Sequence, residues 1–451
     1  PYLYNYVWAG WDKIPYHMRS YGIQVLKGLP VKEVRGRKNV NPVVGIDVAK
    51  GESQAQIFLD RNKLYGKGFR FSHTITDLEW LHGRLKEVEK DSGCRPAIIL
   101  EATGHYHLPI VEWAEEKNYD LYILNPLLAQ RAKKTHLRKV KTDKLDAVHL
   151  GELYYKEEFE PYQKQETHWL HLRHLTRQHE AMTDMYVQTK LQFRAVLDQV
   201  FPTYEGVFGD LYSTVSLGVL EMYSTPGAVK TAGVDKLAEC MNTKLVRGRS
   251  PKWAKEKAID MMAAAEKSPF QEGVHESYVL SLRMFITLLL QYQEHLSKLE
   301  KQIDALAEEK KEYDLLRSIP GVGNKIAATI LAEIGEIERF DHAKKLVAFA
   351  GVDPSVTSSG KFTASTNRIT KRGSKRLRRA LYQAVQCGVR RRKGCLLQSS
   401  VNQRLREYYD VKKGEGKPHK QVVIACVNKL IRWIYCILTR SEPYKADFQS
   451  A

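Results

Sequence analysis

The sequence predicts a multidomain chain in which one α/β domain is followed by mainly helical domains. Between residues 42 and 160, short apolar runs typical of strands alternate with amphipathic segments typical of helices. Two long segments further along repeat apolar residues at steps of three and four, which is a helical pattern. The chain has 451 residues, 43% of them hydrophobic, which is enough for two or three domains with real cores.

The chain begins with a segment that shows no sustained periodicity. It is rich in Tyr, Trp, Gly and basic side chains. We assign residues 1–41 as an N-terminal arm. The sequence leaves open whether this arm docks onto a partner or is partly disordered.

Residues 42–160 predict a compact α/β domain that begins with three strands close enough to pair antiparallel. The expected order is strand 42–48, strand 53–59, strand 68–74, helix 76–88, strand 96–101, helix 108–117, strand 120–124 and a last helix that carries two Asp residues. This order is ribonuclease-H-like. A general nucleotide-binding α/β fold would require a Gly-rich phosphate loop after the first strand, and residues 48–52 (VAKGE) do not form one.

Four acids of this domain are candidate metal ligands. Asp47 and Glu101 each end an apolar strand, and Asp143 and Asp146 share one face of the last helix. Each acid alone is more often structural, but carboxylates that converge in one pocket need cations to offset their repulsion. Oxygen ligands suit Mg²⁺, and two such ions about 4 Å apart are the usual device for displacement at a phosphodiester. The set therefore predicts a two-metal site that cuts or joins nucleic acid.

Residues 165–310 predict two long helices whose apolar positions form a coiled-coil seam. The seam runs along residues 172–200 of the first helix and residues 285–306 of the second. The helices can pair within the chain as a hairpin or between chains as a dimerisation element. Residues 202–275, which contain Gly, Pro and Thr breaks and short helices, are expected to form an insertion at the tip of the hairpin.

Residues 312–445 predict a mainly helical C-terminal domain that starts with a helix-hairpin-helix-like element. Its turn contains Gly321 and Gly323, and Lys325 follows at the start of the next helix. Such a turn lets the backbone approach a phosphate, and the next helix presents free N–H groups to it. The alternative is a plain helix–loop–helix turn.

The strongest basic signal lies in the same domain. Between Lys361 and Cys395 there are twelve Lys or Arg residues and no acid. Together with the turn, this window supplies the candidate nucleic-acid-binding residues, which are Gly321, Gly323, Lys325, Lys361, Arg368, Lys371, Arg372, Lys375, Arg376, Arg378 and Arg379. The Ser- and Gly-containing loop at residues 355–360 precedes the window. On local sequence alone it is an ordinary turn, because a serine hydroxyl is a poor nucleophile until a base or metal activates it.

Overall composition agrees with a polyanionic partner. The chain holds 71 Lys or Arg against 52 Asp or Glu, a formal charge of +19, which favours nucleic acid over an anionic membrane surface. No apolar stretch approaches the ~18–20 residues of a membrane span. Six scattered cysteines without a CxxC pair argue against zinc and against a disulfide framework. We therefore expect a reduced, cytoplasmic protein without a membrane partner.

Taken together, these residues resemble the DEDD transposases, the bridge-RNA-guided serine recombinases of the insertion sequence 110 family and their Piv/MooV-type invertase relatives. The resemblance covers roughly residues 42–160 and 285–440. Its motifs, in order, are residues 45–50 (GIDVAK), 101–104 (EATG), 125–126 (NP), 141–147 (KTDKLDA), 319–323 (IPGVG) and 348–360 running into 378–381. Each motif is short, and six in the right order are highly specific.

The resemblance implies a RuvC-like first domain whose four Mg²⁺-binding acids fall on Asp47, Glu101, Asp143 and Asp146. The family's nucleophilic serine falls on Ser359, which would attack a DNA phosphate and become covalently joined to a strand end, and Ser358 is its neighbour. The family pairs the first domain of one subunit with the serine domain of another. It selects target and donor double-stranded DNA through an element-encoded bridge RNA.

We therefore expect an RNA-guided DNA recombinase of a mobile insertion sequence, a homodimer or homotetramer associated with the bacterial nucleoid. Two alternatives remain open. One is a RuvC-like metal-dependent junction nuclease in which water attacks and Ser359 is incidental. The other is a non-catalytic nucleic-acid-binding scaffold. The sequence assigns no role to the arm or to the insertion.

Overall fold

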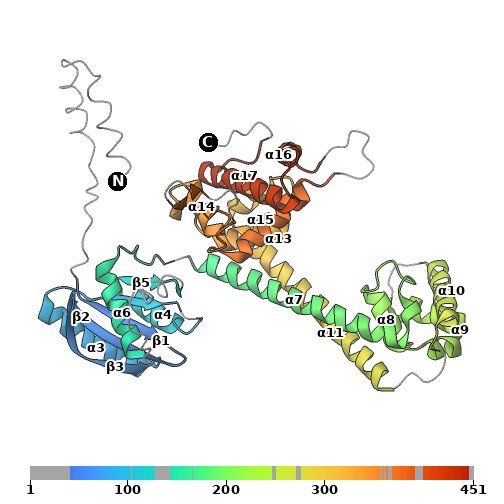
Figure 1. Ribbon diagram of the computed structural model, residues 1–451. Helices are drawn as coiled ribbons and strands as arrows, with labels where there is room; N and C mark the ends of the chain where they lie inside the picture. Colours follow the sequence, from blue (N-terminus) through green and yellow to red (C-terminus); the bar gives the residue numbers. More distant parts are fainter. Residues whose placement is uncertain are drawn as a thin grey trace, which may run out of the picture. The chain divides into compact units, whose positions relative to one another are not determined.

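The computed structural model describes residues 41–102, 104–126, 143–164, 166–245, 250–270, 276–355, 358–359, 362–363, 368–391 and 400–445. The N-terminal arm and Lys361 lie outside these residues. The chain divides into two compact units, Pro1–Lys164 and Gln165–Ala451, and each is described by itself (Figure 1).

The first unit is a mixed five-stranded sheet with helices on both faces. Its elements are β1 (Val43–Val48), β2 (Glu52–Asp60), β3 (Lys63–Ser72), α3 (Ile75–Ser92), β4 (Ala97–Glu101), α4 (Leu108–Glu116), β5 (Leu121–Leu124) and α6 (Asp143–Lys156). The strands lie in the order β3-β2-β1-β4-β5, with the first three antiparallel and with β4 and β5 parallel to β1. The predicted order of strands and helices is confirmed.

One boundary differs from the prediction. β3 begins at Lys63 rather than at residue 68, because Asn62 takes a left-handed backbone conformation (φ 62°) that closes a tight turn. Pairing therefore starts at once, with Asp60 opposite Lys63.

The two faces of this sheet have separate cores. Side chains of one parity, such as Val44, Ile46 and Leu100, pack under α3 and α4. Side chains of the other parity, such as Val43 and Ile99, pack under α6. A helix on each face is what a sheet with parallel central strands requires.

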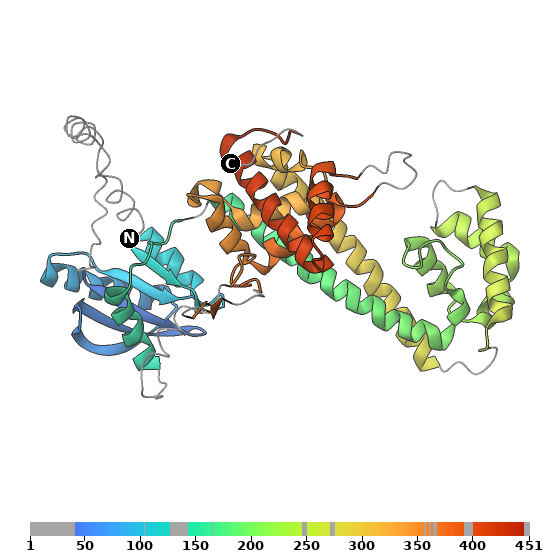
Figure 2. The ribbon, with the colours of Figure 1, turned by 45° about the horizontal axis from the view of Figure 1, so that its top comes forward.

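The second unit is built on two long helices, α7 (Thr167–Val200) and α11 (Glu276–Glu308), which run side by side (Figure 2). They are antiparallel, since His179 bonds to Glu300 while Tyr186, further along α7, bonds to Gln293, which comes earlier in α11. The helices thus pair within the chain, one of the two arrangements that the seam allowed.

The described residues between 202 and 270 form the tip, a small helical body at one end of this hairpin. It contains η3 (Pro202–Tyr204), α8 (Thr214–Met222), α9 (Pro226–Cys240), η4 (Met241–Leu245) and α10 (Pro251–Lys267). Its core also includes the adjoining ends of α7 and α11, through residues such as Phe193 and Ile286.

The described residues between 311 and 445 form the C-terminal block, whose core takes in the other end of the hairpin through residues such as Leu172 and Ile303. Its elements are α12 (Lys311–Arg317), α13 (Asn324–Ile334), η5 (Ile337–Arg339), α14 (Ala343–Ala350), β6 (Ser358–Ser359), β7 (Phe362–Thr363), α15 (Lys375–Gly388), α16 (Gln403–Gly414) and α17 (His419–Arg440). Among the described helices, α17 alone is long and apolar enough to cross a membrane. Its buried side chains, Trp433 among them, belong to the core of the block.

Candidate active site and nucleic-acid surface

Asp47 and Glu101 lie at the same edge of the sheet. β1 and β4 are adjacent and parallel, and Ile46 pairs with Leu100, so the next residues on each strand are neighbours. Because side chains alternate along a strand, Asp47 shares a face with Val43, and Glu101 shares it with Ile99. This is the face that α6 covers. The prediction that both acids end neighbouring strands is consistent with this register.

Close backbone packing places the start of α6 over this edge. A Cβ on Gly45 of β1 would overlap the carbonyl oxygen of Ala147 and approach the Gly151 nitrogen to 2.7 Å. A Cβ on Gly151 would in turn overlap the ring of Phe58, which pairs with Val43 near the beginning of β1. α6 therefore runs antiparallel to β1, so its first turn lies toward Asp47.

The first turn of α6 carries the Asp pair. Asp146 is only 7% exposed, and Asp143 is the first residue of the helix; the Asp143 side chain lies outside what the structure describes. Within the described residues, no three His, Cys, Asp or Glu side chains are gathered closely enough to hold a metal ion. The chemistry of the described donors nevertheless fits a hard divalent cation, because Asp47, Glu101 and Asp146 all supply carboxylate oxygens.

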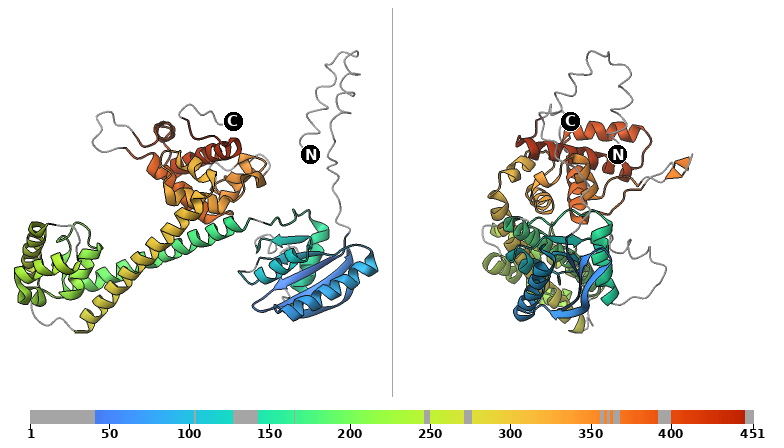
Figure 3. Two further views of the ribbon diagram at one scale, coloured as in Figure 1. Left: turned by 180° about the vertical axis from the view of Figure 1, so that it is seen from behind. Right: turned by 90° about the vertical axis from the view of Figure 1, so that its left-hand side faces the viewer.

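Ser359 lies on a small β-hairpin that stands out from the helices of the C-terminal block (Figure 3). β6 and β7 pair antiparallel, with Ser358 opposite Thr363 and Ser359 opposite Phe362. Nearer the helices, Pro354 forms an isolated antiparallel bridge to Ile369. The serine segment is therefore the end of a two-stranded extension and not an isolated loop.

Hydrogen bonds fix the base of this hairpin. The Thr370 hydroxyl donates to the Asp353 carboxylate at 2.6 Å, and the Ser355 backbone N–H and hydroxyl both donate to the Arg368 carbonyl at 2.7 Å. The segment that carries this hairpin joins the helices of the block at a point of close backbone contact, since a Cβ on Gly373 would overlap the Phe349 carbonyl. Such contacts set the direction in which the Ser359 segment leaves the block.

The candidate basic residues fall into two groups. Arg368, Lys371, Arg372 and Lys375 lie next to the hairpin base and are exposed. The others are held by the fold. Arg378 donates to the Ala350 carbonyl at 2.8 Å, and burial lowers the pKa of its guanidinium from the usual value.

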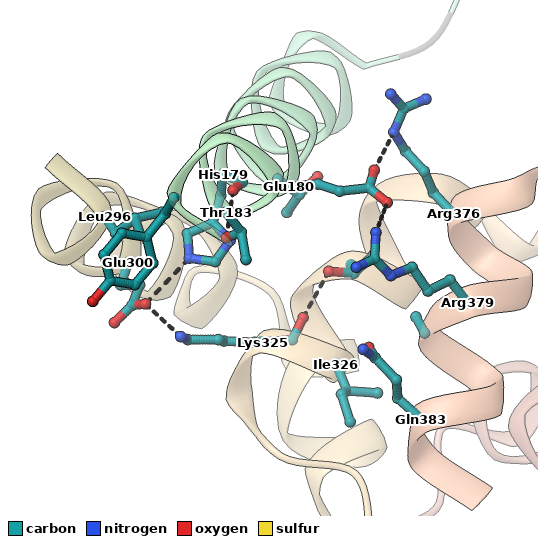
Figure 4. Close-up of a pocket in the computed structure, with 14 residues that line it drawn as sticks. His179, Glu180, Thr183, Leu296, Glu300, Lys325, Ile326, Arg376, Arg379 and Gln383 are labelled. Carbon is teal, nitrogen blue, oxygen red and sulfur yellow. Dashed lines mark hydrogen bonds and ion pairs between the residues drawn. The ribbon is translucent and has the colours of Figure 1, made fainter. Parts of the chain in front are cut away.

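Arg376 and Arg379 are both joined to α7 of the helical hairpin through Glu180 (Figure 4), and Arg379 also pairs with Asp184 of α7 at 3.5 Å. Glu180 of α7 accepts hydrogen bonds from Arg376 Nε at 2.6 Å and from Arg379 Nη1 at 2.9 Å. Lys325 is likewise paired with Glu300 of α11, which also contacts His179. Burial would raise the pKa of the Glu300 carboxyl, but hydrogen bonds from Lys325 and His179 outweigh it and lower that pKa.

The glycine turn connects α12 to α13 as a helix–turn–helix, and its two glycines differ. Gly321 (φ 103°) packs against the end of α15, where a Cβ would lie 2.7 Å from the Gly388 Cα. Gly323 is exposed, has open space around it and precedes the first turn of α13. Gly321 is thus required by packing inside the block, whereas Gly323 leaves room for a ligand.

A buried junction that no sequence pattern predicted links these parts. Glu333 of α13 is 3% exposed and accepts two hydrogen bonds from Arg177 of α7, at 2.8 and 3.1 Å. It also accepts one from Ser374, the residue that caps α15. Burial raises the pKa of the Glu333 carboxyl, but Arg177 and Ser374 more than reverse this and hold it below the usual value. The partners are far apart in sequence, so no local pattern could have revealed them.

Comparison with known proteins places these features in a family. A model described as Transposase, the DEDD type of IS110, matches residues 44–202, and one described as Transposase IS116/IS110/IS902 family matches residues 313–410. Together they cover more than half of the chain. The chain belongs to the IS110 family of DEDD transposases.

Individual relatives agree with this assignment. The chain is 28% identical to an uncharacterized 43.6 kDa protein of insertion element IS110 from Streptomyces coelicolor, over 57% of this chain and 60% of the relative. It is 29% identical to the transposase for insertion sequence element IS1111A of Coxiella burnetii, over 36% and 43%. It is 27% identical to the pilin gene-inverting protein of Moraxella bovis, over 32% and 41%. The matched part spans less than two thirds of each relative.

The two family matches contain the candidate chemistry and omit the tip. All four acids lie within residues 44–202, and Ser359 lies within residues 313–410 with the exposed basic residues at its hairpin. The tip, apart from its first residue, and α17 lie outside both matched regions.

Proposed function

We propose that this protein is the transposase of an insertion sequence and acts as a DNA recombinase that cuts and rejoins strands through Ser359. The observation that carries the proposal is the register that sets Asp47 beside Glu101 under the first turn of α6. The strand order β3-β2-β1-β4-β5 supports a ribonuclease-H-like, RuvC-like unit. The family match supports the order of the four acids and the serine.

In the proposed reaction, Ser359 Oγ attacks the phosphorus of a scissile phosphodiester. A bond forms between Oγ and phosphorus as the bond from phosphorus to one deoxyribose oxygen breaks. The serine proton leaves to a base, and the departing oxygen takes up a proton. Attack by a strand-end hydroxyl then reverses these steps and releases the serine, so a strand is exchanged without loss of a phosphate bond.

The carboxylates and the basic residues have separate tasks. Asp47, Glu101, Asp143 and Asp146 would hold Mg²⁺, which when bound offsets negative charge at a phosphate and lowers the pKa of a hydroxyl. Arg368, Lys371, Arg372 and Lys375 bind backbone phosphates beside the hairpin. Phosphate contacts position DNA but carry no sequence information.

The choice of target and donor DNA is therefore assigned to base pairing with a bridge RNA encoded by the element. Assembly is proposed as a homodimer or homotetramer, in which the acids of one subunit serve the serine of another. Action on genomic DNA places the protein with the bacterial nucleoid. Sequencing the RNA that copurifies with the full chain tests the guide: one defined RNA from beside the gene is expected, and random cellular RNA would contradict it.

Ser359→Ala, with Ser358→Ala as its matched control, tests the nucleophile. The readouts are excision of the element from a plasmid and a denaturant-resistant protein–DNA adduct. Ser359→Ala should abolish both and Ser358→Ala should retain both. Continued cutting by Ser359→Ala would instead indicate a junction nuclease that uses water. Asp47→Ala should abolish excision while DNA binding persists, and unchanged excision would indicate a scaffold.

A further inference from the structure

Two adjoining cavities follow the exposed face of α15. One, of about 430 Å³, lies between α7, α11, α13 and α15. The other, of about 650 Å³, lies between α15, the segment after it, α16 and the start of α17. Ile326 and Gln383 line both cavities, so the two form one groove along the helix.

The groove face of α15 carries long hydrogen-bonding side chains at helical spacing. They are Arg376, Arg379, Gln383, Gln386 and, just beyond the helix, Arg390. The opposite face, with Leu377, Leu381 and Val385, is buried in the core. Because α15 has 14 residues, the groove runs about 21 Å, the length of about six base pairs of DNA.

Glu180 occupies one end of this groove in the way that a phosphate would. Its two oxygens each accept a hydrogen bond from a different guanidinium, Arg376 at 2.6 Å and Arg379 at 2.9 Å. The Glu180 side chain is 23% exposed and borders the cavity (Figure 4). Paired guanidinium groups are common partners of both carboxylates and phosphates, so a phosphate entering the groove would compete with Glu180 for them.

We propose that the groove along α15 seats the backbone of double-stranded DNA leading away from Ser359, and that Glu180 holds the two arginines until a phosphate replaces it. The inference rests on the proposed function. DNA is favoured because Ser374, the cap of α15, follows shortly after Ile369, whose bridge to Pro354 lies at the base of the serine hairpin. A duplex whose phosphate reaches Ser359 therefore meets the start of the groove next.

The proposal predicts that removing the Glu180 charge tightens DNA binding. Full-length Glu180→Gln is compared with the wild type for a labelled 30-base-pair DNA duplex and for an RNA duplex of the same length, between about 0.1 and 0.3 M salt. Release of Arg376, and partial release of Arg379, which also pairs with Asp184 at 3.5 Å, should raise DNA affinity up to about tenfold and steepen its salt dependence by about one to two phosphate contacts. Arg376→Gln in the Glu180→Gln background should remove about half of the increase.

Glu294→Gln is the matched control, because Glu294 lies on the same hairpin in an exposed pair with Lys298. Equal affinities of Glu180→Gln and Glu294→Gln would overturn the proposal, and so would a gain confined to the RNA duplex. Should Glu180→Gln fail to fold, Arg390→Gln tests the same groove. Its DNA affinity should be lower than that of the wild type, and the slope of its salt dependence should fall by about one phosphate contact. Binding needs no strand cleavage, so strand cutting that persists in Ser359→Ala, with the groove result intact, would reject the nucleophile and not the groove.

Discussion

The tip and the C-terminal block both close an end of the α7–α11 hairpin with their own cores, yet they differ completely in charge. In residues 202–275, nine Lys or Arg are balanced by nine Asp or Glu, whereas residues 312–445 hold 27 Lys or Arg against 11 acids. The block therefore carries +16 of the formal charge of +19. Of these two regions, only the block therefore carries a surplus of positive charge that would attract a polyanion such as the proposed DNA, and the tip has no net charge.

The largest expected effect is at a glycine of the block. Gly373→Ala places a Cβ on the Phe349 carbonyl and within 2.8 Å of the Ala348 oxygen, and backbone atoms cannot move aside as a side chain can. We expect a loss of about 3 kcal/mol or more in the free energy of unfolding, together with loss of strand exchange. Gly209→Ala in the tip, where a Cβ meets nothing within 4 Å, should stay within about 0.5 kcal/mol. Denaturant unfolding measures both changes. Equal losses in the free energy of unfolding would show that the base of the serine β-hairpin is not tightly packed.

The buried junction comes next. Arg177→Met removes both hydrogen bonds to Glu333, which is 3% exposed, and leaves a buried carboxylate without its main cation. The free energy of unfolding of the block should fall by about 3 kcal/mol. The amides in the core of the tip should keep their protection from hydrogen exchange. Hydrogen exchange followed region by region measures this difference. An equal loss of exchange protection in the tip and the block would mean that the two regions, joined by α7 and α11, unfold together and not separately.

A charge comparison tests the central difference directly. The exposed pair Lys371 and Arg372 beside the serine hairpin is changed to Gln, and so is the exposed pair Lys252 and Lys255 of α10 in the tip. If the first pair contacts two phosphates, duplex affinity should fall roughly 10- to 30-fold near 0.15 M salt. The tip pair should leave affinity unchanged. Equal losses, measured by fluorescence anisotropy, would remove the distinction between the regions.

The smallest expected effect is on the stability of the block at acidic pH. The pKa of the Glu333 carboxyl is lowered in the folded block from its ordinary value of 4.5. The stabilisation is therefore fully present above that value and is lost as the pH falls through the lower folded pKa. The free energy of unfolding of the block should decline below about pH 4.5, and Glu333→Gln should flatten the decline. Thermal melts at a series of pH values check this, and an unchanged slope in the variant would assign acid sensitivity elsewhere.

The sequence by itself determined the order of elements, because strand and helix periods and turn residues act over a few positions. It therefore located strands ending at Asp47 and Glu101, the helix that begins with Asp143, the apolar seams of α7 and α11, and the concentration of charge after Ser359. Each of these depends on neighbours within about one turn of helix or one strand.

The tertiary structure alone decided which basic side chains remain open to a ligand. Arg376 and Arg379 look like Lys371 and Arg372 in the sequence, but Glu180, about two hundred residues earlier in the chain, holds them. The same is true of Gly321, which is required by its contact with Gly388, and of Glu333, which bonds to Arg177 and Ser374. Such contacts join residues distant in sequence, and they are set by how whole helices pack, which no local pattern encodes.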